Sequence, residues 1–541
     1  MSDGLSGSER PSALHLHSDP IKYPQQPREQ LITPAYTRRS PWMEHRMRFS
    51  FLIKAVVATA LVMAFDRLLP VRMAGAVVGA FATAWLIGLV AARADVRRDY
   101  RACIALGAAA LFVTSLIDDP GPLGWTMFWC ALSLAALLPR TARFDGAWRW
   151  AARLLLHAAS SAVRPIHDLQ RRHRHPHGHR RGVRATLAIL AFPFIGAALF
   201  LALFAAANPL IAETLATIRL PSLRQVVVWM IVGCGVWPSL RPHPPVLRLA
   251  NRLPEPEPRL PGTSLPSVLI ALALFNALFA VQNALDIVIL WNGGPLPSGM
   301  TQTEYVHRGA YPLIVTALIA GVMALAMLRP GSASERQPWA RRMVVLWVAQ
   351  NLILVASSVW RTIDYIQTSM LTEWRIAALA WMALVAFGLG TIGWRIIKGR
   401  SARWLVNGNA AAALVVLTPC AFLDLGAIAA HWNVRHQAPA ALDLCYLNQV
   451  GDGALLPLIE LERRPMDGAT RERVHYVREV LLGRLDARQS HWRTWTPRGA
   501  RRLAQAKATL GAAFHPIWPI DGDDGRACDG VRYQPATSVW P

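Results

Sequence analysis

The sequence predicts an all-α fold: a polytopic bundle of about eleven transmembrane helices, with a small helical extramembrane segment after it. Composition supports this prediction, because the 541 residues are 53% hydrophobic and 17% charged, whereas soluble proteins carry about 25% charged residues. The apolar residues also fall into long uniform runs, and a helix of roughly 20 apolar residues crosses the hydrocarbon core of a bilayer. A transmembrane β-barrel is excluded because apolar and polar residues do not alternate along the runs.

Each candidate span is an apolar run of about the required length. The first run contains Lys54, whose long side chain can reach the membrane surface from inside a span. The runs are 49–69, 73–92, 102–117, 124–138, 185–207, 224–240, 267–291, 311–328, 343–360, 375–394 and 404–430.

Arg and Lys are concentrated in every second loop between these runs. Residues 93–101 and the loop 140–184 are rich in Arg, whereas the loops on either side of each are poor in it. Basic loops stay on the cytoplasmic side, so we expect a cytoplasmic N-terminus and, after eleven spans, an outside location for 431–541. The chain has a net charge of +24, and most of the positive charge before residue 430 is therefore explained by topology, whereas the Arg-rich segment 431–541 is not. We expect the lipid bilayer, and no nucleic acid, as the partner of these basic residues.

The chain divides into three regions. Residues 1–48 are polar and rich in Pro and Ser, without the apolar core of a signal peptide, and we expect a disordered cytoplasmic tail. Residues 49–430 form the transmembrane domain, and 431–541 form the extramembrane segment. Within the basic loop, 144–166 predicts an amphipathic helix, which lies in the membrane interface or packs as a connector on the bundle.

The C-terminal segment is expected to be helical. Val474, Val477 and Leu481 recur at helical spacing within 467–488, and Thr496-Pro497 is a typical helix start.

Six cysteines are present, and none forms a CxxC pair. Cys445 and Cys528 are the only two in the C-terminal segment. If that segment lies outside, a disulfide between them is feasible; if it does not, both remain free thiols.

The sequence contains no P-loop, HExxH or GxSxG motif, and no GxGxxG that opens a Rossmann unit. We therefore expect no cofactor, and we favour a non-enzymatic function. A dense run of histidines in the basic loop could bind Zn, Ni or Cu, but the arginines among them oppose a cation. A basic loop near anionic lipid is the stronger interpretation. The histidines are His173, His175, His177 and His179.

Polar residues inside spans are costly in hydrocarbon and usually face the bundle interior or water. Asn276, Asn283 and Asp286 fall on one helical face. Their alternative role is to hold packed helices together. The intramembrane candidates are Asn276, Gln282, Asn283, Asp286, Gln350, Asn351 and Asp424.

The predicted orientation gathers the acids of the membrane domain toward the outer face, where we expect a polar vestibule. Arg361 and Asp364, placed in an outer loop, are three residues apart and could pair. Alternatively, acids are merely tolerated where positive charge is disfavoured. The outer-face candidates are Asp118, Asp119, Asn208, Glu304, Tyr305, His307, Arg308, Arg361 and Asp364.

Several long segments resemble the bacterial membrane family known as domain of unknown function 4173, which is related to family 4153. They are FNALFAVQNALDIVILWNGGPLPSG within 275–328, IDDPGPL (117–123), LFAAANPL (203–210), WVAQNLILVASSVWRTIDYIQTSM within 347–382 and AIAAHWNVRHQAPAALDLCYL (427–447).

The family's tract of Tyr, a basic residue, Gly and Tyr corresponds to Tyr305, His307-Arg308, Gly309 and Tyr311. The chain departs from the family at His431-Trp432, where members have Arg-Tyr. The resemblance implies a multi-span protein of the bacterial inner membrane and brings no biochemical activity.

Three functions fit these observations. The first is a transporter or permease, because intramembrane Asp286, Asn276 and Asn283 are typical of proton or substrate sites. The second is a non-catalytic envelope or signalling scaffold. The third is a membrane enzyme acting on an envelope lipid or glycan through outer acids such as Glu304. The sequence does not predict protein partners or oligomeric state.

Overall fold

The computed structural model describes residues 41–68, 75–141, 144–162, 221–253, 264–288, 318–327, 336–511 and 526–532, with a few single residues between these ranges. Contacts divide the chain into two units, Met1–Phe51 and Leu52–Pro541. In the first unit the structure describes the beginning of α1 (Pro41–Leu68), and the other elements belong to the second unit. The predicted all-α class is confirmed: the described residues form helices, and their one extended pairing is the isolated bridge Arg526–Arg532.

Seven helices in the described part of the chain are long and apolar enough to cross a membrane. The spans 102–117, 124–138, 224–240, 343–360 and 375–394 each correspond to one of them, whereas 185–207 lies largely outside the described residues. Two shorter apolar helices are α2 (Ala76–Ala92) and Leu318–Met327. The seven are α4 (Tyr100–Asp118), α5 with the 3-10 turn η1 (Pro122–Arg140), α10 (Leu223–Leu240), α12 (Leu265–Asp286), α15 (Pro338–Ser369), α16 (Glu373–Lys398) and α17 (Ala402–Phe422).

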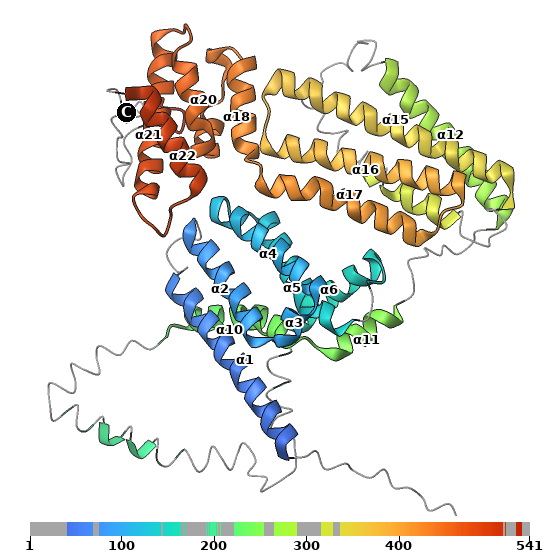
Figure 1. Ribbon diagram of the computed structural model, residues 1–541. Coiled ribbons are helices and arrows are strands. Elements are labelled where there is room, and N and C mark those ends of the chain that lie inside the picture. Colours follow the sequence, from blue (N-terminus) through green and yellow to red (C-terminus); the bar gives the residue numbers. More distant parts are fainter. Residues whose placement is uncertain are drawn as a thin grey trace, which may run out of the picture. The chain divides into compact units, whose positions relative to one another are not determined.

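The helices α12, α15, α16 and α17 lie side by side (Figure 1). Their shared core joins Leu272 of α12, Trp347 of α15 and Leu389 of α16. The ring of Trp347 stacks on Phe275, with ring centroids 5.1 Å apart, and meets the edge of Phe279 at 5.7 Å. Aromatic packing of this kind adds about 0.5–1.5 kcal/mol beyond area burial, and it fixes α12 against α15.

The helices α12 and α15 run parallel. Asn276 donates to the carbonyl of Met343, and Asn283 donates to the carbonyl of Gln350. Both partners advance by seven residues, which is the repeat of helices that supercoil around each other. α15 continues to Ser369, so Arg361 and Asp364 lie within this helix, whereas the sequence placed them in a loop.

The last expected span, 404–430, is divided in the structure. α17 ends at Phe422, and Asp424 caps a new helix, α18 (Leu425–His436), by accepting from the backbone N–H of Ala427 at 2.8 Å. Ala430 and Val434 of α18 belong to the hydrophobic core of the C-terminal helices. The C-terminal domain therefore begins at α18, a few residues before the expected boundary at 431.

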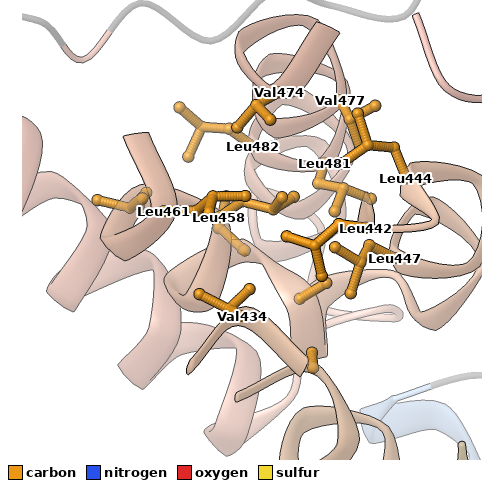
Figure 2. Close-up of a cluster of buried hydrophobic side chains, with 14 of the residues drawn as sticks. Val434, Leu442, Leu444, Leu447, Leu458, Leu461, Val474, Val477, Leu481 and Leu482 are labelled. Carbon is orange, nitrogen blue, oxygen red and sulfur yellow. The ribbon is translucent and has the colours of Figure 1, made fainter. Parts of the chain in front are cut away.

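The C-terminal domain consists of α18, α19 (Leu444–Val450), α20 (Asp452–Glu462), α21 (Gly468–Gln489) and α22 (Pro497–Leu510). Figure 2 shows that Leu458, Leu461 and Leu481 point toward one another between these helices. The helix predicted over 467–488 is confirmed as α21. The helix start predicted at Thr496-Pro497 is confirmed as well, because the Thr496 hydroxyl accepts from the N–H of Gly499 at 3.0 Å.

Two buried arginines, Arg93 and Arg153, join helices and connecting segments in the N-terminal half of the described chain. Arg93, between α2 and α3 (Ala94–Arg98), donates to the carbonyls of Ala136 and Ser239. The amphipathic sequence forms α6 (Ala147–Ser161), and its Arg153 pairs with Asp145 and reaches Asn251 of α11 (Pro244–Arg252). These contacts anchor α6 against α11.

Candidate functional site

A seam of polar side chains lies between α12 and α15. Asn276, Asn283 and Asp286 of α12 are 8%, 5% and 0% exposed, as expected for residues that share one helical face. Facing them, α15 contributes Asn351, which is 1% exposed, and Gln350, whose side-chain oxygen is buried. The structure therefore brings together on one seam six of the seven intramembrane residues singled out in the sequence, with Gln282 as the sixth.

The asparagine amide groups hold the two helices together. Asn276 Nδ2 donates to the carbonyl of Leu272 at 2.8 Å and to that of Met343 at 3.1 Å. Asn283 Nδ2 donates to the carbonyl of Gln350 at 3.1 Å. Such interhelical bonds contribute about 0.6 kcal/mol each in membrane proteins, so the seam is only modestly stabilised by them.

One end of the seam carries a buried ion pair. The guanidinium of Arg361 donates to Oδ1 of Asp286, and Gln282 Nε2 donates to the same oxygen at 2.9 Å. The side chains of Arg361 and Asp286 are 5% and 1% exposed. Charges inside a membrane domain are expensive, and they commonly mark substrate paths or proton relays.

Sequence reasoning proposed Asp364, three residues further along, as the partner of Arg361. The structure instead joins Arg361 to Asp286, 75 residues away, while Asp364 lies half-buried further along α15. The rule that side chains three or four residues apart meet cannot find a partner on another helix.

A second polar cluster lies where α4 and α17 end and α22 begins. Asp118 Oδ1 accepts from the backbone N–H of Arg498 at 2.9 Å, and the guanidinium of Arg498 donates to the carbonyl of Phe422 at 2.7 Å. Asp424 accepts from Arg502 at 2.5 Å. A carboxylate at the start of a helix satisfies free N–H groups and favours the helix dipole. Asp118 therefore acts as a cap for α22 from another part of the chain.

The surroundings of Asp424 and Asp119 shift their pKa values in opposite directions. Burial alone would raise the pKa of Asp424, but the charge of Arg502, the N–H of Ala427 and Arg498 outweigh it, so its pKa is lowered. Burial, the Asp424 charge and Asp118 raise the pKa of Asp119 against the pull of Arg498 and Arg502. Asp424 is therefore a stabilised anion, whereas ionised Asp119 is held at a cost.

Backbone bonds join the C-terminal domain to the beginning of α2. The N–H of Ala76 donates to the carbonyl of Trp495 at 2.9 Å. Gly75 has φ +70°, and a Cβ there would lie 2.6 Å from the carbonyl carbon of Thr494, so only glycine fits this approach. The start of α2 and the ends of α4 and α17 therefore meet one domain. Sequence reasoning missed Arg498 and Arg502, whose only signal was the Arg excess in 431–541.

A disulfide joins Cys445 of α19 to Cys528. The short segment 526–532 is also held by Arg473, which donates to Asp529 at 2.6 Å, and by Asn448, which donates to the carbonyl of Cys528 at 3.0 Å. The segment is therefore fixed onto the α19–α21 face by covalent and polar contacts together.

The remaining candidates lie outside the described residues: His173, His175, His177, His179, Asn208, Glu304, Tyr305, His307 and Arg308. Among the residues that the structure does describe, no group of three or more His, Cys, Asp or Glu could hold a metal ion.

Comparison with models of protein families identifies the family of the chain. A family model described as a domain of unknown function, DUF4153, matches residues 101–461. The chain belongs to the DUF4153 family. The matched region contains the α12–α15 seam, Asp118 and Asp424, and it ends before α22 with Arg498 and Arg502. No curated protein and no solved structure matches the chain.

Proposed function

We propose that this DUF4153 protein is a permease that moves a polar solute across the membrane. The observation that carries the proposal is the Asp286–Arg361 ion pair, buried between two membrane-length helices at the end of a polar seam. A buried ion pair is a weak contributor to stability, because desolvation of two charges offsets their attraction. Function is the better reason for keeping such a pair in hydrocarbon.

The pair also has chemistry suited to a transport cycle. Arg361 can release Asp286 to bind an ammonium or hydroxyl group, or itself bind a carboxylate or phosphate by two parallel hydrogen bonds. In the empty state Asp286 and Arg361 neutralise each other. When a charged solute binds to one of them in place of the other, the charge of that residue is still neutralised. Polar α12 side chains beside the pair extend this path along the helix.

Solid-supported membrane electrophysiology tests the proposal. Proteoliposomes are exposed in turn to sugars, amino acids, organic anions and organic cations, and we expect a transient current for one class. Asp286→Asn should abolish that current, whereas Leu278→Ala, on the exposed face of α12, should retain it. Equal currents in wild type and Asp286→Asn would contradict the proposal, as would no current for any class.

We propose further that the protein resides in the bacterial inner membrane, as the resemblance to family 4173 implies, with its N-terminus cytoplasmic and its C-terminal domain outside. Arg-rich loops on alternate sides support this orientation, and the Cys445–Cys528 disulfide suits an oxidising compartment. An alkaline phosphatase fusion after Pro541 should be active and a fluorescent-protein fusion dark. The opposite pattern would reverse the orientation.

A scaffold is the second candidate, favoured by the C-terminal domain that docks on α2, α4 and α17. In that role the domain would bind an envelope partner, and the membrane helices would anchor it. Crosslinking in whole cells, with Arg498→Glu and Arg502→Glu to weaken docking, tests this function. Loss of a crosslinked partner together with retained solute currents would show both functions in one chain.

A further inference from the structure

The α12–α15 seam contains more hydrogen-bonding capacity than its described residues use. Asn276, Asn283 and Asn351 each donate through the amide nitrogen to a helix carbonyl, and their side-chain oxygens are buried without a partner among the described residues. Further buried atoms of these helices share this condition, among them Gln350 Oε1, Asp286 Oδ2 and Trp347 Nε1.

Each such atom destabilises the folded protein unless it finds a hydrogen-bond partner. Five of the six atoms named above are oxygens that accept, and Trp347 Nε1 is a donor. A water molecule donates two bonds and accepts others, and buried waters typically make about three. Water therefore satisfies this mixture of atoms, which no single apolar or anionic ligand can do.

The spacing of these atoms decides between a single ion and a chain of waters. Asn276 and Asn283 are seven residues apart, or about 10 Å along the helix axis at 1.5 Å per residue. Oxygens bind a hard cation at about 2.4 Å, so these two cannot share one ion. From Asn276 to Asp286 the row extends about 15 Å, half of the roughly 30 Å hydrocarbon core.

We infer that the seam holds a file of water molecules along which protons reach Asp286. In the final step an O–H bond of a hydrated proton breaks as an O–H bond forms at Asp286 Oδ2, the oxygen that Arg361 does not occupy. The carboxylate becomes a neutral carboxyl group, Arg361 keeps its proton, and the reverse step returns the proton. Among the described residues, Arg361 and Gln282 donate to the carboxylate, and the Ser357 hydroxyl also lies beside it.

This inference deepens the proposed permease by naming the proton as its coupling ion, and in that respect it rests on the proposed function. Hydration of the seam does not depend on transport, so the two can fail separately.

Radiolytic hydroxyl labelling of the intact protein in lipid tests the hydration. Trp347 is 2% exposed with a free Nε1, whereas Trp85 is 6% exposed and its Nε1 donates to Ser239 at 3.0 Å. Radicals form from bound water, so we expect Trp347 to be hydroxylated about tenfold more than Trp85. Asn351→Leu should reduce labelling of Trp347 and leave Trp85 unchanged. Equal labelling of the two tryptophans would overturn the inference.

Proton flux into proteoliposomes loaded with a pH-sensitive dye tests the relay. A potassium diffusion potential should drive acidification in wild type and in Leu278→Ala, and both Asn283→Leu and Asp286→Asn should lower the rate about tenfold. Labelled Trp347 without proton flux would overturn the relay. Solute currents with unlabelled Trp347 and no proton flux would overturn the inference but leave the proposed permease standing. Labelled Trp347 and proton flux without any solute current would overturn the permease but leave the hydrated proton path standing.

Discussion

Asp424 performs two tasks with one carboxylate. It caps α18 through Ala427 and binds Arg502 and Arg498 of α22. Sequence reasoning selected Asp424 as a polar residue of a span, but its partners lie 78 and 74 residues further along and follow no local rule. Its side chain is 23% exposed, so the pairs are only partly screened by solvent.

Asp424→Asn separates the two tasks, because Asn caps a helix as well as Asp does. We expect a loss of about 1–3 kcal/mol from the charged hydrogen bonds, and a further 1 kcal/mol or so in Asp424→Ala, which also lacks the cap. The measurement is the midpoint of unfolding in detergent, with tryptophan fluorescence as the probe. Asp467→Asn, at the exposed cap of α21, is the control, and an equal loss there would refute the role of the ion pairs.

For Asp119 we expect stability to depend on pH in the opposite direction to that for Asp424. Because its pKa is raised in the folded protein above the ordinary 3.8, the folded state binds the proton more tightly than the unfolded state. Stability therefore falls as pH rises from 3.8 through the raised pKa. Asp119→Asn should increase the unfolding midpoint at pH 7.5, and the gain should shrink as pH falls toward 3.8.

The pKa of Asp424 is lowered, so its contribution to the stability of the fold is present above 3.8 and is lost as pH falls through the lowered value.

For Asp119, an unfolding midpoint of Asp119→Asn below that of wild type at pH 7.5 would show that Arg498 and Arg502 outweigh burial at this carboxyl.

At the scale of elements, helices were predictable and their pairing was not. Apolar runs of about 20 residues located the long helices, and shared faces located Asn276, Asn283 and Asp286. The break at Leu423–Asp424 was missed because PCAFLDLGAIAA reads as one apolar run. The local signal for this break was Asp424, which caps α18 by accepting from Ala427, and the C-terminal core then buries α18.

Parallel packing of α12 and α15 makes a direct crosslinking prediction. In a background with Cys103, Cys130, Cys234 and Cys420 replaced by alanine, the pairs Asn276→Cys with Met343→Cys and Asn283→Cys with Gln350→Cys should form disulfides on oxidation. The mismatched pair, Asn276→Cys with Gln350→Cys, is about 10 Å out of register and should not. Gel mobility after cleavage of a protease site inserted between the helices measures the crosslink, and the reverse pattern would indicate antiparallel helices.

At the scale of the whole molecule, the disulfide closes a long loop. Cys445 and Cys528 are 83 residues apart, and the chain-entropy relation gives about 4.5 kcal/mol of stabilisation for a loop of this size. Cys445→Ser or Cys528→Ser should therefore lower the unfolding midpoint of the C-terminal domain. Limited proteolysis should cut near residue 526 faster in these variants, while cleavage of the membrane helices stays unchanged. Unchanged cleavage at both places would show that Arg473 and Asn448 hold the segment without the bond.

The long-range pairing of acids with arginines could not be predicted from the sequence. The topology that we propose accounts for the charge before residue 430, but the Arg excess of the C-terminal segment follows no topology rule. Two of these arginines have a tertiary explanation, because Arg498 and Arg502 meet Asp118 and Asp424 only when α22 reaches the ends of α4 and α17.

The capping of α22 by Asp118 sets an order of events during synthesis. Arg498 follows Asp118 by 380 residues, so at about 5–20 residues per second the ribosome needs roughly 20–75 s to supply the partner. Throughout that interval the helices already made present an acidic end, which α22 then covers. A chain that stops short of α22 therefore keeps Asp118 without the N–H that Arg498 donates to it.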